Sequence, residues 1–462
     1  MARAIKALDV WMNGERVGVW QPSRAGSPTF QYHEEWLASD LARPISLSLP
    51  FVPANEPHRG EYVSAWFDNL LPDSEPIRKR LGQRFHTPSL QTFDLLAAIG
   101  RDCVGAVQIV PAGVDPGDVR RIEADPLTDA QVAAVLRGVA VSQPFGANDS
   151  DELRISIAGA QEKTALLRIG DRWHRPRGAT PTTHILKLPL GLIGNIRANM
   201  RDSVENEWLC LAFLRLLELP VAKASIASFS DDVSDEKALV VERFDRRHVS
   251  ATADTPEWIL RLPQEDFCQA TRTPANRKYE TDGGPGISTG LALLGGGERY
   301  QDDALTFAKA QLAFWLLAAP DGHAKNFSIF LRRSGYIMTP LYDVLSAWPI
   351  VGKGTNKLAQ QDVKLAMALR GRHTHRRLNE IAIPHWRSLA AQTGTTNAFQ
   401  QMVLMVDAVD SALDALESSL DANFPEHVWS SISKGIRSQR ARFKKGLERG
   451  DITDKLSRAA SN

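Results

Sequence analysis

An apolar helix that leads directly into a polar loop is the feature of this sequence that most limits its fold. Residues 304–317 follow a helical pattern that ends before Pro320, as a proline requires. The apolar stretch Leu312–Pro320 is half as long as the roughly 18 residues of a membrane span, which indicates a core helix. Asp321-Gly-His-Ala-Lys-Asn326 follows at once. A structural turn does not need so many functional groups, so this loop predicts a functional site at the end of a buried helix.

The spacing of residues around this loop predicts phosphoryl-transfer chemistry. Asp321 and Asn326 are five residues apart, as are the catalytic Asp and metal-binding Asn of protein kinases. Asp343 follows 17 residues later, far enough for a hairpin to return it to the same site. One carboxylate can accept a hydroxyl proton, while an amide and a second carboxylate offer oxygen ligands to Mg²⁺. The spacing is typical of a kinase-like site, although an isolated Asp and Asn at this separation are common.

A small-residue turn and a lysine in a strand complete the predicted phosphate-binding elements. The turn is Ser156-Ile-Ala-Gly159-Ala-Gln-Glu-Lys163, between two strand-like segments. It does not fit the P-loop pattern, which disfavours a P-loop ATPase, and it lacks the three glycines of the usual kinase loop. An ordinary hairpin turn therefore stays open as its interpretation. Lys187 is placed like the kinase lysine that pairs with nucleotide phosphates, and Glu207, or else Glu205, could orient it.

Composition excludes several other classes of function. The chain has 462 residues, enough for two or three domains, and a formal net charge of +1, which gives no global basic field for nucleic acid. Its three cysteines are far apart and odd in number, which argues against a disulfide framework and for a reducing compartment. No spacing suggests a zinc site. The sequence also has no secretory signal or membrane-length apolar stretch, so we expect a soluble, cytoplasmic protein with no membrane partner.

Local patterns predict individual elements along the chain. Asn13-Gly14 between apolar runs predicts a hairpin. Asp202 followed by Glu205 predicts a capping box at the start of a helix over residues 203–217. An acidic amphipathic helix and then a basic one are expected in the last hundred residues. Further helices are predicted over 66–71, 77–85 and 93–99, and further strands over 106–110, 164–167, 184–188, 238–242 and 336–339.

These segments resemble the HipA family of bacterial serine/threonine protein kinases, which are the toxins of toxin–antitoxin pairs. The similarity runs along nearly the whole chain, strongest over residues 154–343 and weakest after residue 370. The segments that carry it are Phe67–Ser74, Phe93–Leu96, Ile99–Asp102, Ser156–Leu167, Thr180–Ile185, Val241–Arg247, Leu262–Asp266, Asp282–Gly286, Asp321–Phe327 and Lys364–Met367.

The resemblance implies an α+β, protein-kinase-like, two-lobed fold, with a mixed α/β N-terminal subdomain and an all-helical C-terminal subdomain. The expected divisions are a β-rich N-terminal subdomain over 1–110, a polar junction over 111–150, a nucleotide-binding part of the kinase N-lobe over 151–250, and a helical C-terminal lobe with the catalytic and metal-binding loops over 251–462.

The resemblance also implies ATP and Mg²⁺ as cofactors and assigns roles to particular residues. Asp321 would be the catalytic base, Asn326 and Asp343 the Mg²⁺ ligands, and Lys187 the phosphate-pairing lysine. The phosphate loop would be formed by Ala158, Gly159, Ala160, Gln161, Glu162 and Lys163. Glu242, Arg243 and Phe244 would be the hinge that meets the adenine, and His323, Ala324, Lys325 and Tyr342 would line the nucleotide pocket together with Asn326 and Asp343.

Regulation and partners are implied in the same way. Family members phosphorylate the serine just before the phosphate loop, here Ser156, and its added charge could eject a loop that must hold ATP phosphates. The family's protein target is glutamyl-tRNA synthetase, whose phosphorylation stalls translation and promotes growth arrest and persistence. A helix-turn-helix, HipB-like antitoxin binds the kinase, and the complex represses its operon on operator DNA.

Two other functions stay open at this stage. One is a small-molecule or lipid kinase on the same scaffold. The other is a non-catalytic transcriptional co-repressor that depends on its antitoxin. Basic segments over 370–377 and 434–449 leave open whether this chain touches DNA phosphates itself.

Overall fold

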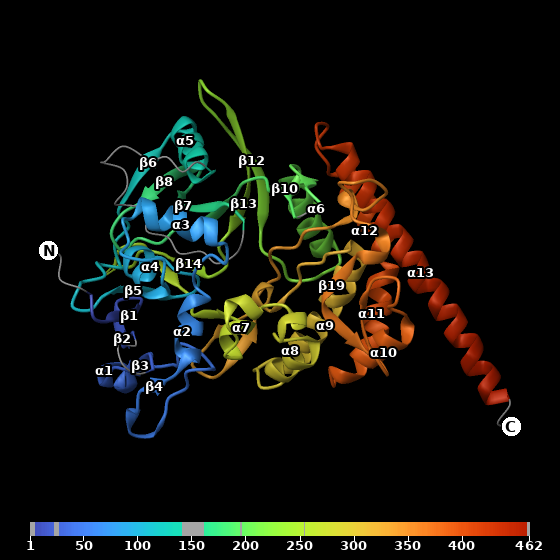
Figure 1. The fold of residues 1–462 in the computed structure, drawn as a ribbon, viewed down its shortest axis with the longest axis horizontal. Helices are drawn as coiled ribbons and strands as arrows, with labels where there is room; N and C mark the ends of the chain where they lie inside the picture. The colour runs from blue at the N-terminus through green and yellow to red at the C-terminus, as the bar shows by residue number, and fades with distance from the viewer. Residues whose placement is uncertain (1–4, 23–26, 141–160, 195, 254, 460–462) are drawn as a thin grey trace. The chain divides into compact units, whose positions relative to one another are not determined.

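The computed structural model describes residues 5–22, 27–140, 161–194, 196–253 and 255–459, and Figure 1 shows their fold. The chain forms two compact units. The first unit contains residues 1–188, 223–278 and 328–336, and the second contains residues 189–222, 279–327 and 337–462. Each unit is therefore assembled from three separate stretches of sequence. Among the described helices, none is long and apolar enough to cross a membrane.

The first unit begins with a five-stranded antiparallel sheet in the order β4-β3-β2-β1-β5. Its strands are β1 (Leu8–Met12), β2 (Glu15–Gln21), β3 (Thr29–Tyr32), β4 (His58–Arg59) and β5 (Val107–Pro111). The predicted hairpin at Asn13-Gly14 is confirmed, and both residues have the positive φ, 47° and 89°, that a tight primed turn requires. The Asn13 side chain also exchanges two hydrogen bonds with the backbone of Arg261, at 2.9 and 3.0 Å, which ties the turn to a later strand.

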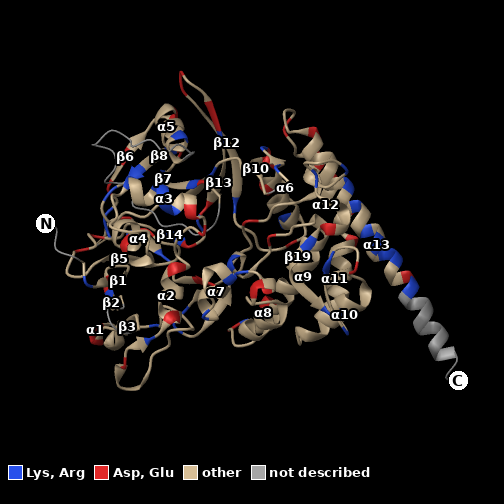
Figure 2. Ribbon diagram, viewed as in Figure 1, with Lys and Arg blue, Asp and Glu red and all other residues tan. Residues whose placement is uncertain are grey.

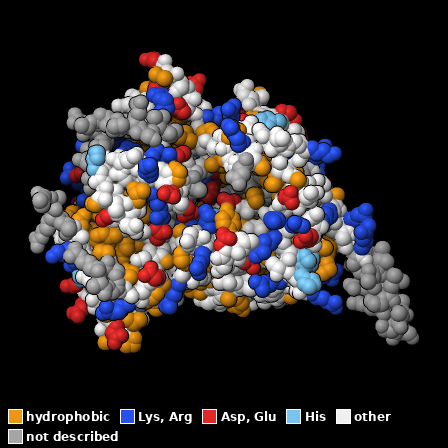
Figure 3. Space-filling view, in the orientation of Figure 1, with side chains coloured by type: hydrophobic (Ala, Val, Ile, Leu, Met, Phe, Trp, Pro, Cys, Tyr) orange, Lys and Arg blue, Asp and Glu red, His pale blue; other side chains and the backbone are white. Residues whose placement is uncertain are grey.

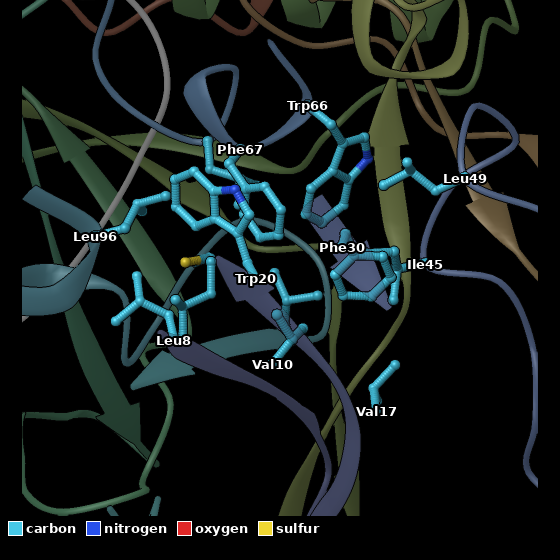
Figure 4. Packing of buried hydrophobic residues seen from close by; sticks show 14 of the residues in the cluster. Leu8, Val10, Val17, Trp20, Phe30, Ile45, Leu49, Trp66, Phe67 and Leu96 are labelled. Carbon is cyan, nitrogen blue, oxygen red and sulfur yellow. The ribbon is translucent and has the colours of Figure 1, made fainter. Parts of the chain in front are cut away.

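Aromatic side chains fill the core between this sheet and its helices (Figure 4). Trp20 stacks on Phe67 with ring centroids 4.0 Å apart, and Phe93 packs edge-on against Trp20 at 5.2 Å. Such residues come from α1 (Glu34–Ala38), α2 (Glu61–Asp68) and α4 (Thr92–Ile99), while α3 (Glu75–Arg84) contributes Leu81 and a 3₁₀ turn lies at η1 (Pro53–Asn55). The helices predicted on both sides of Pro72 and over 93–99 are thus present.

A six-stranded sheet in the order β12-β13-β9-β7-β8-β6 forms the other part of the first unit. Helix α5 (Asp129–Ala140) packs on it and buries Val132 and Leu136 against Leu166 and Leu186. The strands are β6 (Ala124–Leu127), β7 (Lys163–Ile169), β8 (Arg172–Pro176), β9 (His184–Lys187), β12 (Ala224–Ser230) and β13 (Asp235–Glu242). The polar stretch 111–150 therefore contains a strand and a helix of this unit.

A buried cluster of charges links several segments of the first unit. The Asp102 carboxylate pairs with Arg243 at 3.2 Å, with Arg246 at 2.9 Å and with Arg261 at 3.5 Å, and Asp245 pairs with Arg243 and Arg246 at 2.8 and 3.0 Å. All five side chains are almost fully buried. Burial alone raises the pKa of Asp102, but the three guanidinium groups outweigh it and hold that pKa far below its usual range.

Short elements complete the first unit. β16 pairs antiparallel with β17, a strand that comes more than sixty residues later in the chain. The bounds are β14 (Arg246–Val249), β15 (Trp258–Arg261), β16 (Gln264–Asp266), α7 (Phe267–Ala270), η2 (Ala275–Arg277) and β17 (Ser328–Leu331). The chain passes into the second unit within β18 (Tyr336–Met338).

The second unit is mainly helical, and α9 (Tyr300–Leu317) lies at its centre. Trp315 of α9 packs against Trp386 at 5.7 Å, and Phe307 packs against Phe327 at 4.8 Å. The other helices are α6 (Ser203–Leu216), α8 (Ile287–Leu294), α10 (Ile383–Gln392), α11 (Ala398–Asp407), α12 (Val409–Ser418) and α13 (Glu426–Ala459). The capping box predicted for α6 is wrong, because Asp202 makes no side-chain cap bond and contacts His427 at 2.9 Å instead.

Two hairpins accompany these helices, β10 (Gly191–Ile193) with β11 (Ala198–Met200), and β19 (Lys364–Arg370) with β20 (Thr374–Arg377). In Figure 3, histidine side chains lie beside Lys and Arg side chains near α10, where the rings of His375 and His385 stack at 4.1 Å. Short 3₁₀ turns occur at η3 (Glu280–Asp282), η4 (Ala324–Asn326), η5 (Trp348–Ile350) and η6 (Gln360–Asp362).

The basic helix expected near the C-terminus is α13, and the positions of its Lys and Arg residues are blue on the ribbon in Figure 2. Several of these cations already have partners within the second unit. Arg437, Arg440 and Lys444 pair with Asp414, Asp410 and Asp407 of the acidic helices α11 and α12. Arg442 donates to three backbone oxygens, those of Leu378, Asn379 and Ile381. Much of the positive charge on α13 thus holds the helical unit together.

Candidate functional site

The predicted catalytic loop begins where α9 ends. Ala318 closes the helix in the left-handed conformation, with φ 49°, and Asp321 follows three residues later. Gly322 lies so close to α9 that a Cβ atom there would be only 2.5 Å from the Phe314 ring. This close approach explains the glycine in the loop, and it fixes the loop against the rigid core helix.

The structure brings the loop and Asp343 together through the side chain of Asn326. Its Nδ2 group donates to the backbone oxygen of Asp321 at 2.7 Å and to that of Asp343 at 3.4 Å. Both contacts lie within the second unit. The expectation that Asp343 returns to the loop is therefore met, and the amide nitrogen of Asn326 makes the connection.

Residues that the sequence did not single out hold the segment after Asp343 in place. Asp343 itself has a φ of 59°, a left-handed conformation that is uncommon for residues other than glycine. Three residues later, Ser346 exchanges two hydrogen bonds with the Asn206 side chain, at 2.8 and 2.9 Å, and its hydroxyl donates to Leu317 O at 2.6 Å. The turn that carries Asp343 is thus fixed to both α6 and α9.

The Asp321 side chain has a partner that the sequence also did not indicate. The hydroxyl group of Tyr279 donates to Asp321 Oδ1, and the same oxygen lies 3.6 Å from Nε2 of His323. Tyr279 and His323 pack edge-on with ring centroids 4.9 Å apart. The Asp321 side chain is nevertheless 46% exposed, so its carboxylate is accessible to a reacting group.

Asn326 and Asp343 fit the donor set that Mg²⁺ takes in kinases. Because two backbone oxygens occupy the amide nitrogen of Asn326, its amide is oriented and its Oδ1 is left as the ligand atom. The Asp343 backbone oxygen accepts from the same amide, which places the two residues side by side. One amide oxygen and one carboxylate are few ligands for a dedicated protein cage, but Mg²⁺ usually keeps waters and phosphate oxygens as its remaining ligands.

The other predicted pocket residues of the second unit are largely buried around the loop. His323, Ala324 and Lys325 are all buried. Tyr342 is partly buried, and its hydroxyl group donates to the backbone oxygen of Lys325 at 2.8 Å. Tyr342 therefore fastens the Asp343 segment to the catalytic loop by a second contact, beside that made by Asn326.

The predicted phosphate-binding residues that the structure describes in the first unit lie at the ends of neighbouring strands. Lys163 begins β7 directly opposite Lys187 in β9, and Lys187 is buried in its sheet between β7 and β13. Gln161 donates to Leu188 O at 2.6 Å, and Glu162 pairs with Arg80. Ser156, Ala158, Gly159 and Ala160 lie outside the described residues.

The predicted adenine hinge follows β13. Glu242 is exposed and pairs with Lys223 at 3.3 Å, while Phe244 packs edge-on against Phe330 at 5.7 Å. The side chain of Arg243 is buried in the charge cluster around Asp102, and its backbone N–H donates to Thr183 O at 2.8 Å. Any contact of Arg243 with a nucleotide would therefore have to use its backbone.

Comparisons with known proteins show which family models and relatives the chain is similar to. A family model described as the HipA-like C-terminal domain matches residues 155–416, and one described as the HipA N-terminal domain matches residues 8–110. The chain is 31% identical to "Putative kinase Y4mE" of Sinorhizobium fredii, over 90% of this chain and 92% of the relative. It is 28% identical to "Serine/threonine-protein kinase toxin HipA" of Shewanella oneidensis, over 70% of this chain and 71% of the relative.

A solved structure shares the fold. It is HipA from the complex of Shewanella oneidensis HipA, HipB and their operator DNA, with a TM-score of 0.76 and 22% identity, covering 96% of this chain and 98% of that one. The predicted kinase-like fold, with a mixed α/β N-terminal subdomain and a helical C-terminal one, is thus confirmed, although the C-terminal part is not all-helical as expected. The structure adds two hairpins, β10–β11 and β19–β20, to the helices of the second unit.

Proposed function

Because the chain belongs to the HipA family, we propose that it is a toxin kinase that transfers the γ-phosphate of ATP to a serine hydroxyl group of another protein. One observation carries the proposal. The Asn326 amide holds the backbone of both Asp321 and Asp343, so a proton acceptor and two oxygen ligands are grouped at one point of a rigid helical unit. Phosphoryl transfer depends mainly on such positioning and on charge stabilisation.

In the proposed reaction the serine oxygen attacks the γ-phosphorus of ATP. A new oxygen–phosphorus bond forms, the bond from the γ-phosphorus to the bridging oxygen breaks, and ADP leaves. The Asp321 carboxylate accepts the proton of the serine hydroxyl group and orients that oxygen for attack. The 46% exposure of the side chain is compatible with this role, since the acceptor must reach a hydroxyl group of a separate protein.

Asn326 Oδ1 and the Asp343 carboxylate would hold Mg²⁺, which would neutralise charge on the phosphates. Lys187 would pair with the phosphates, and Lys163 stands opposite it in the sheet, so two cations lie on adjacent strands. The backbone around Glu242 and Phe244 would meet the adenine. These roles are those that the family resemblance implies, and the positions of the residues in the strands and the hinge are compatible with them.

We also propose a protein target for this kinase and two ways in which its activity is regulated. Glutamyl-tRNA synthetase is the first target to test, with arrest of translation, growth arrest and persistence as the consequence. Autophosphorylation at Ser156 would inactivate the kinase. A HipB-like antitoxin would neutralise it and bring the complex to operator DNA; the solved Shewanella complex contains HipA, HipB and operator DNA.

The other two functions receive less support. A chain that binds operator DNA unaided needs cations available to phosphates, but Arg437, Arg440 and Lys444 of α13 pair with carboxylates of the same unit. A small-molecule or lipid kinase could share the Asp321–Asn326 loop. Phosphate acceptance by a protein serine separates that alternative from the proposed function.

The test is phosphate transfer by the purified full chain. The protein is incubated with radiolabelled ATP and Mg²⁺, alone and with glutamyl-tRNA synthetase, and phosphorylated residues are mapped by mass spectrometry. We expect labelled serine with the wild type, a loss of at least about a hundredfold in Asp321→Asn, and no loss in Asp171→Asn, whose carboxylate is fully exposed in the β7–β8 turn. Absence of any phosphoserine with the wild type, or equal labelling by Asp321→Asn, would overturn the proposal.

A further inference from the structure

The two oxygens of the Asp321 carboxylate have different surroundings. Oδ1 accepts the hydroxyl hydrogen of Tyr279 and faces His323 Nε2 at 3.6 Å. Among the described residues, no such contact is made to Oδ2. A carboxylate held at one oxygen cannot rotate freely about its terminal bond, so the other oxygen keeps a fixed direction.

Tyr279 is itself held by the residue that follows it. The Glu280 side chain is only 9% exposed, and its carboxylate accepts from Ala368 N at 2.6 Å and pairs with Arg370 and Arg376 at 3.2 and 3.4 Å. These partners belong to the β19–β20 hairpin. Gly286 gives the carboxylate its space, because a Cβ atom there would lie 2.5 Å from Glu280 Cδ. The backbone oxygen of Tyr279 also accepts from the N–H groups of Asp282 and Gly284, both at 3.0 Å.

The contact differs from those of two other buried or partly buried tyrosines, Tyr32 and Tyr342. The hydroxyl groups of Tyr32 and Tyr342 donate to backbone oxygens, at 2.5 and 2.8 Å, as expected of tyrosines that fasten one segment to another. Tyr279 instead donates to the charged side chain that we assign as the proton acceptor. A hydrogen bond to a charged group is the stronger kind, and here it acts on the orientation of a reacting group.

We propose that Tyr279 is a positioning residue for Asp321. Its hydroxyl group fixes Oδ1, so that Oδ2 faces the substrate hydroxyl group. The neighbouring Glu280, which is bound to the β19–β20 hairpin, holds Tyr279 in place. This inference rests on the proposed kinase function for its catalytic consequence. The contact between Tyr279 and Asp321 does not depend on that function, and it can be tested by a measurement that requires no kinase activity.

The contact is tested by a double-mutant cycle in equilibrium unfolding of the full chain. The variants are Tyr279→Phe, Asp321→Asn and the double variant. If the two side chains interact, the loss of stability in Tyr279→Phe should shrink in the Asp321→Asn background, because the charged acceptor is already gone. Purely additive effects would show that the contact does not form and would overturn the inference.

The positioning role is tested by steady-state kinetics with the protein acceptor labelled by the wild type. Tyr279→Phe should lower kcat by about ten- to a hundredfold, with KM for ATP and the Kd of Mg·ATP unchanged within about twofold. Glu280→Gln should lower kcat in the same direction by a smaller factor. The control is Tyr300→Phe, whose exposed hydroxyl group contacts the Gln301 amide and whose loss should leave kcat unchanged.

The outcomes separate the two proposals. Wild-type protein that labels no acceptor contradicts the kinase function, while the unfolding cycle still reports on the Tyr279–Asp321 contact. Active wild type with an unchanged kcat in Tyr279→Phe overturns the positioning role alone. A raised KM with unchanged kcat would also overturn it, since that pattern indicates lost substrate binding.

Discussion

Asn206 and Ser346 are separated by 140 residues and pair through two hydrogen bonds, in which each side contributes one donor and one acceptor. Both residues are almost fully buried. The pair joins helix α6 to the segment that follows Asp343, and it therefore helps to fix the backbone that carries this residue. A contact so far from the reacting atoms can still decide the rate, because phosphoryl transfer tolerates little displacement.

Replacing Asn206 by alanine should therefore affect both stability and activity. It leaves a buried N–H group and a buried carbonyl oxygen of Ser346 without partners, which costs about 1–3 kcal/mol each. We expect a lower free energy of unfolding in urea, together with slower phosphate transfer. Asn423→Ala, at an exposed position of the same unit, is the control and should change the free energy of unfolding by no more than about 0.5 kcal/mol. Equal stability of wild type and Asn206→Ala would contradict this account.

Asn326→Asp separates metal binding from positioning. The substitution keeps an oxygen ligand of nearly the same shape, but it removes the Nδ2 hydrogens that bind Asp321 O and Asp343 O. It also places carboxylate oxygens against two carbonyl oxygens. We expect phosphate transfer to fall by about tenfold or more, a loss that added Mg²⁺ does not restore. A wild-type rate in Asn326→Asp would mean that only the ligand oxygen matters.

The buried charge cluster should be essential to the stability of the first unit. Asp102→Asn leaves Arg246, Arg243 and Arg261 with one carboxylate fewer, and breaking a buried ion pair costs about 3–5 kcal/mol. Denaturant unfolding followed by intrinsic fluorescence at neutral pH measures the loss. The exposed pair Asp171–Arg168 is the control, for which Asp171→Asn should change stability by no more than about 0.5 kcal/mol.

Glu265 gives a predicted pH dependence of stability. Burial raises its pKa from 4.5 to about 8, although hydrogen bonds from Leu47 N and from the side chains of Ser46 and Trp66 act in the opposite direction. Between these values the folded state keeps a proton that the unfolded chain has released, so the free energy of unfolding should fall as pH rises from about 5 to 8.

The measurement compares wild type with Glu265→Gln at pH 5, 6, 7 and 8. Because glutamine resembles the protonated carboxyl group, the variant should lack this part of the decline, and its stability relative to wild type should increase with pH. Glu15→Gln, at an exposed position of β2, should keep the wild-type slope. Parallel pH profiles for Glu265→Gln and wild type would show that Glu265 is already ionised in the folded protein.

Much of the fold could be predicted because it depends on local signals. The Asn13-Gly14 turn and the apolar helix before Pro320 each follow from a few adjacent residues. Helix α5 was not predicted, because its polar surroundings resemble a junction and only one of its faces, with Val132 and Leu136, is buried. The predicted capping box is absent because of a contact that is distant in sequence. Asp202 has the neighbours that a capping box needs, but its carboxylate contacts His427, which lies 225 residues away.

The candidate site was likewise predictable in part: residues close in sequence were found, and distant contacts were not. The grouping of Asp321, Asn326 and Asp343 was predictable from spacing within one short stretch. Tyr279 could not be found, because it lies 42 residues before Asp321 and nothing near it in the sequence marks a contact with a carboxylate. The roles of Lys187 and the phosphate loop, and the divisions at residues 110, 150 and 250, stay predictions.

The division of each unit into three stretches of sequence has a consequence for synthesis. The first unit includes β17, and β16 finds its partner strand only when residues 328–331 have left the ribosome. The predicted catalytic loop, residues 321–326, emerges just before that strand, and Asp343 emerges after it. A nascent chain therefore completes neither unit until β17 and the segment after it have been translated, although all strands of the five-stranded sheet have emerged once Pro111 is made. A ribosome that stops before Asp343 releases a fragment that lacks part of the candidate catalytic centre, so a cell that makes this kinase is exposed to its activity only after that residue has been translated.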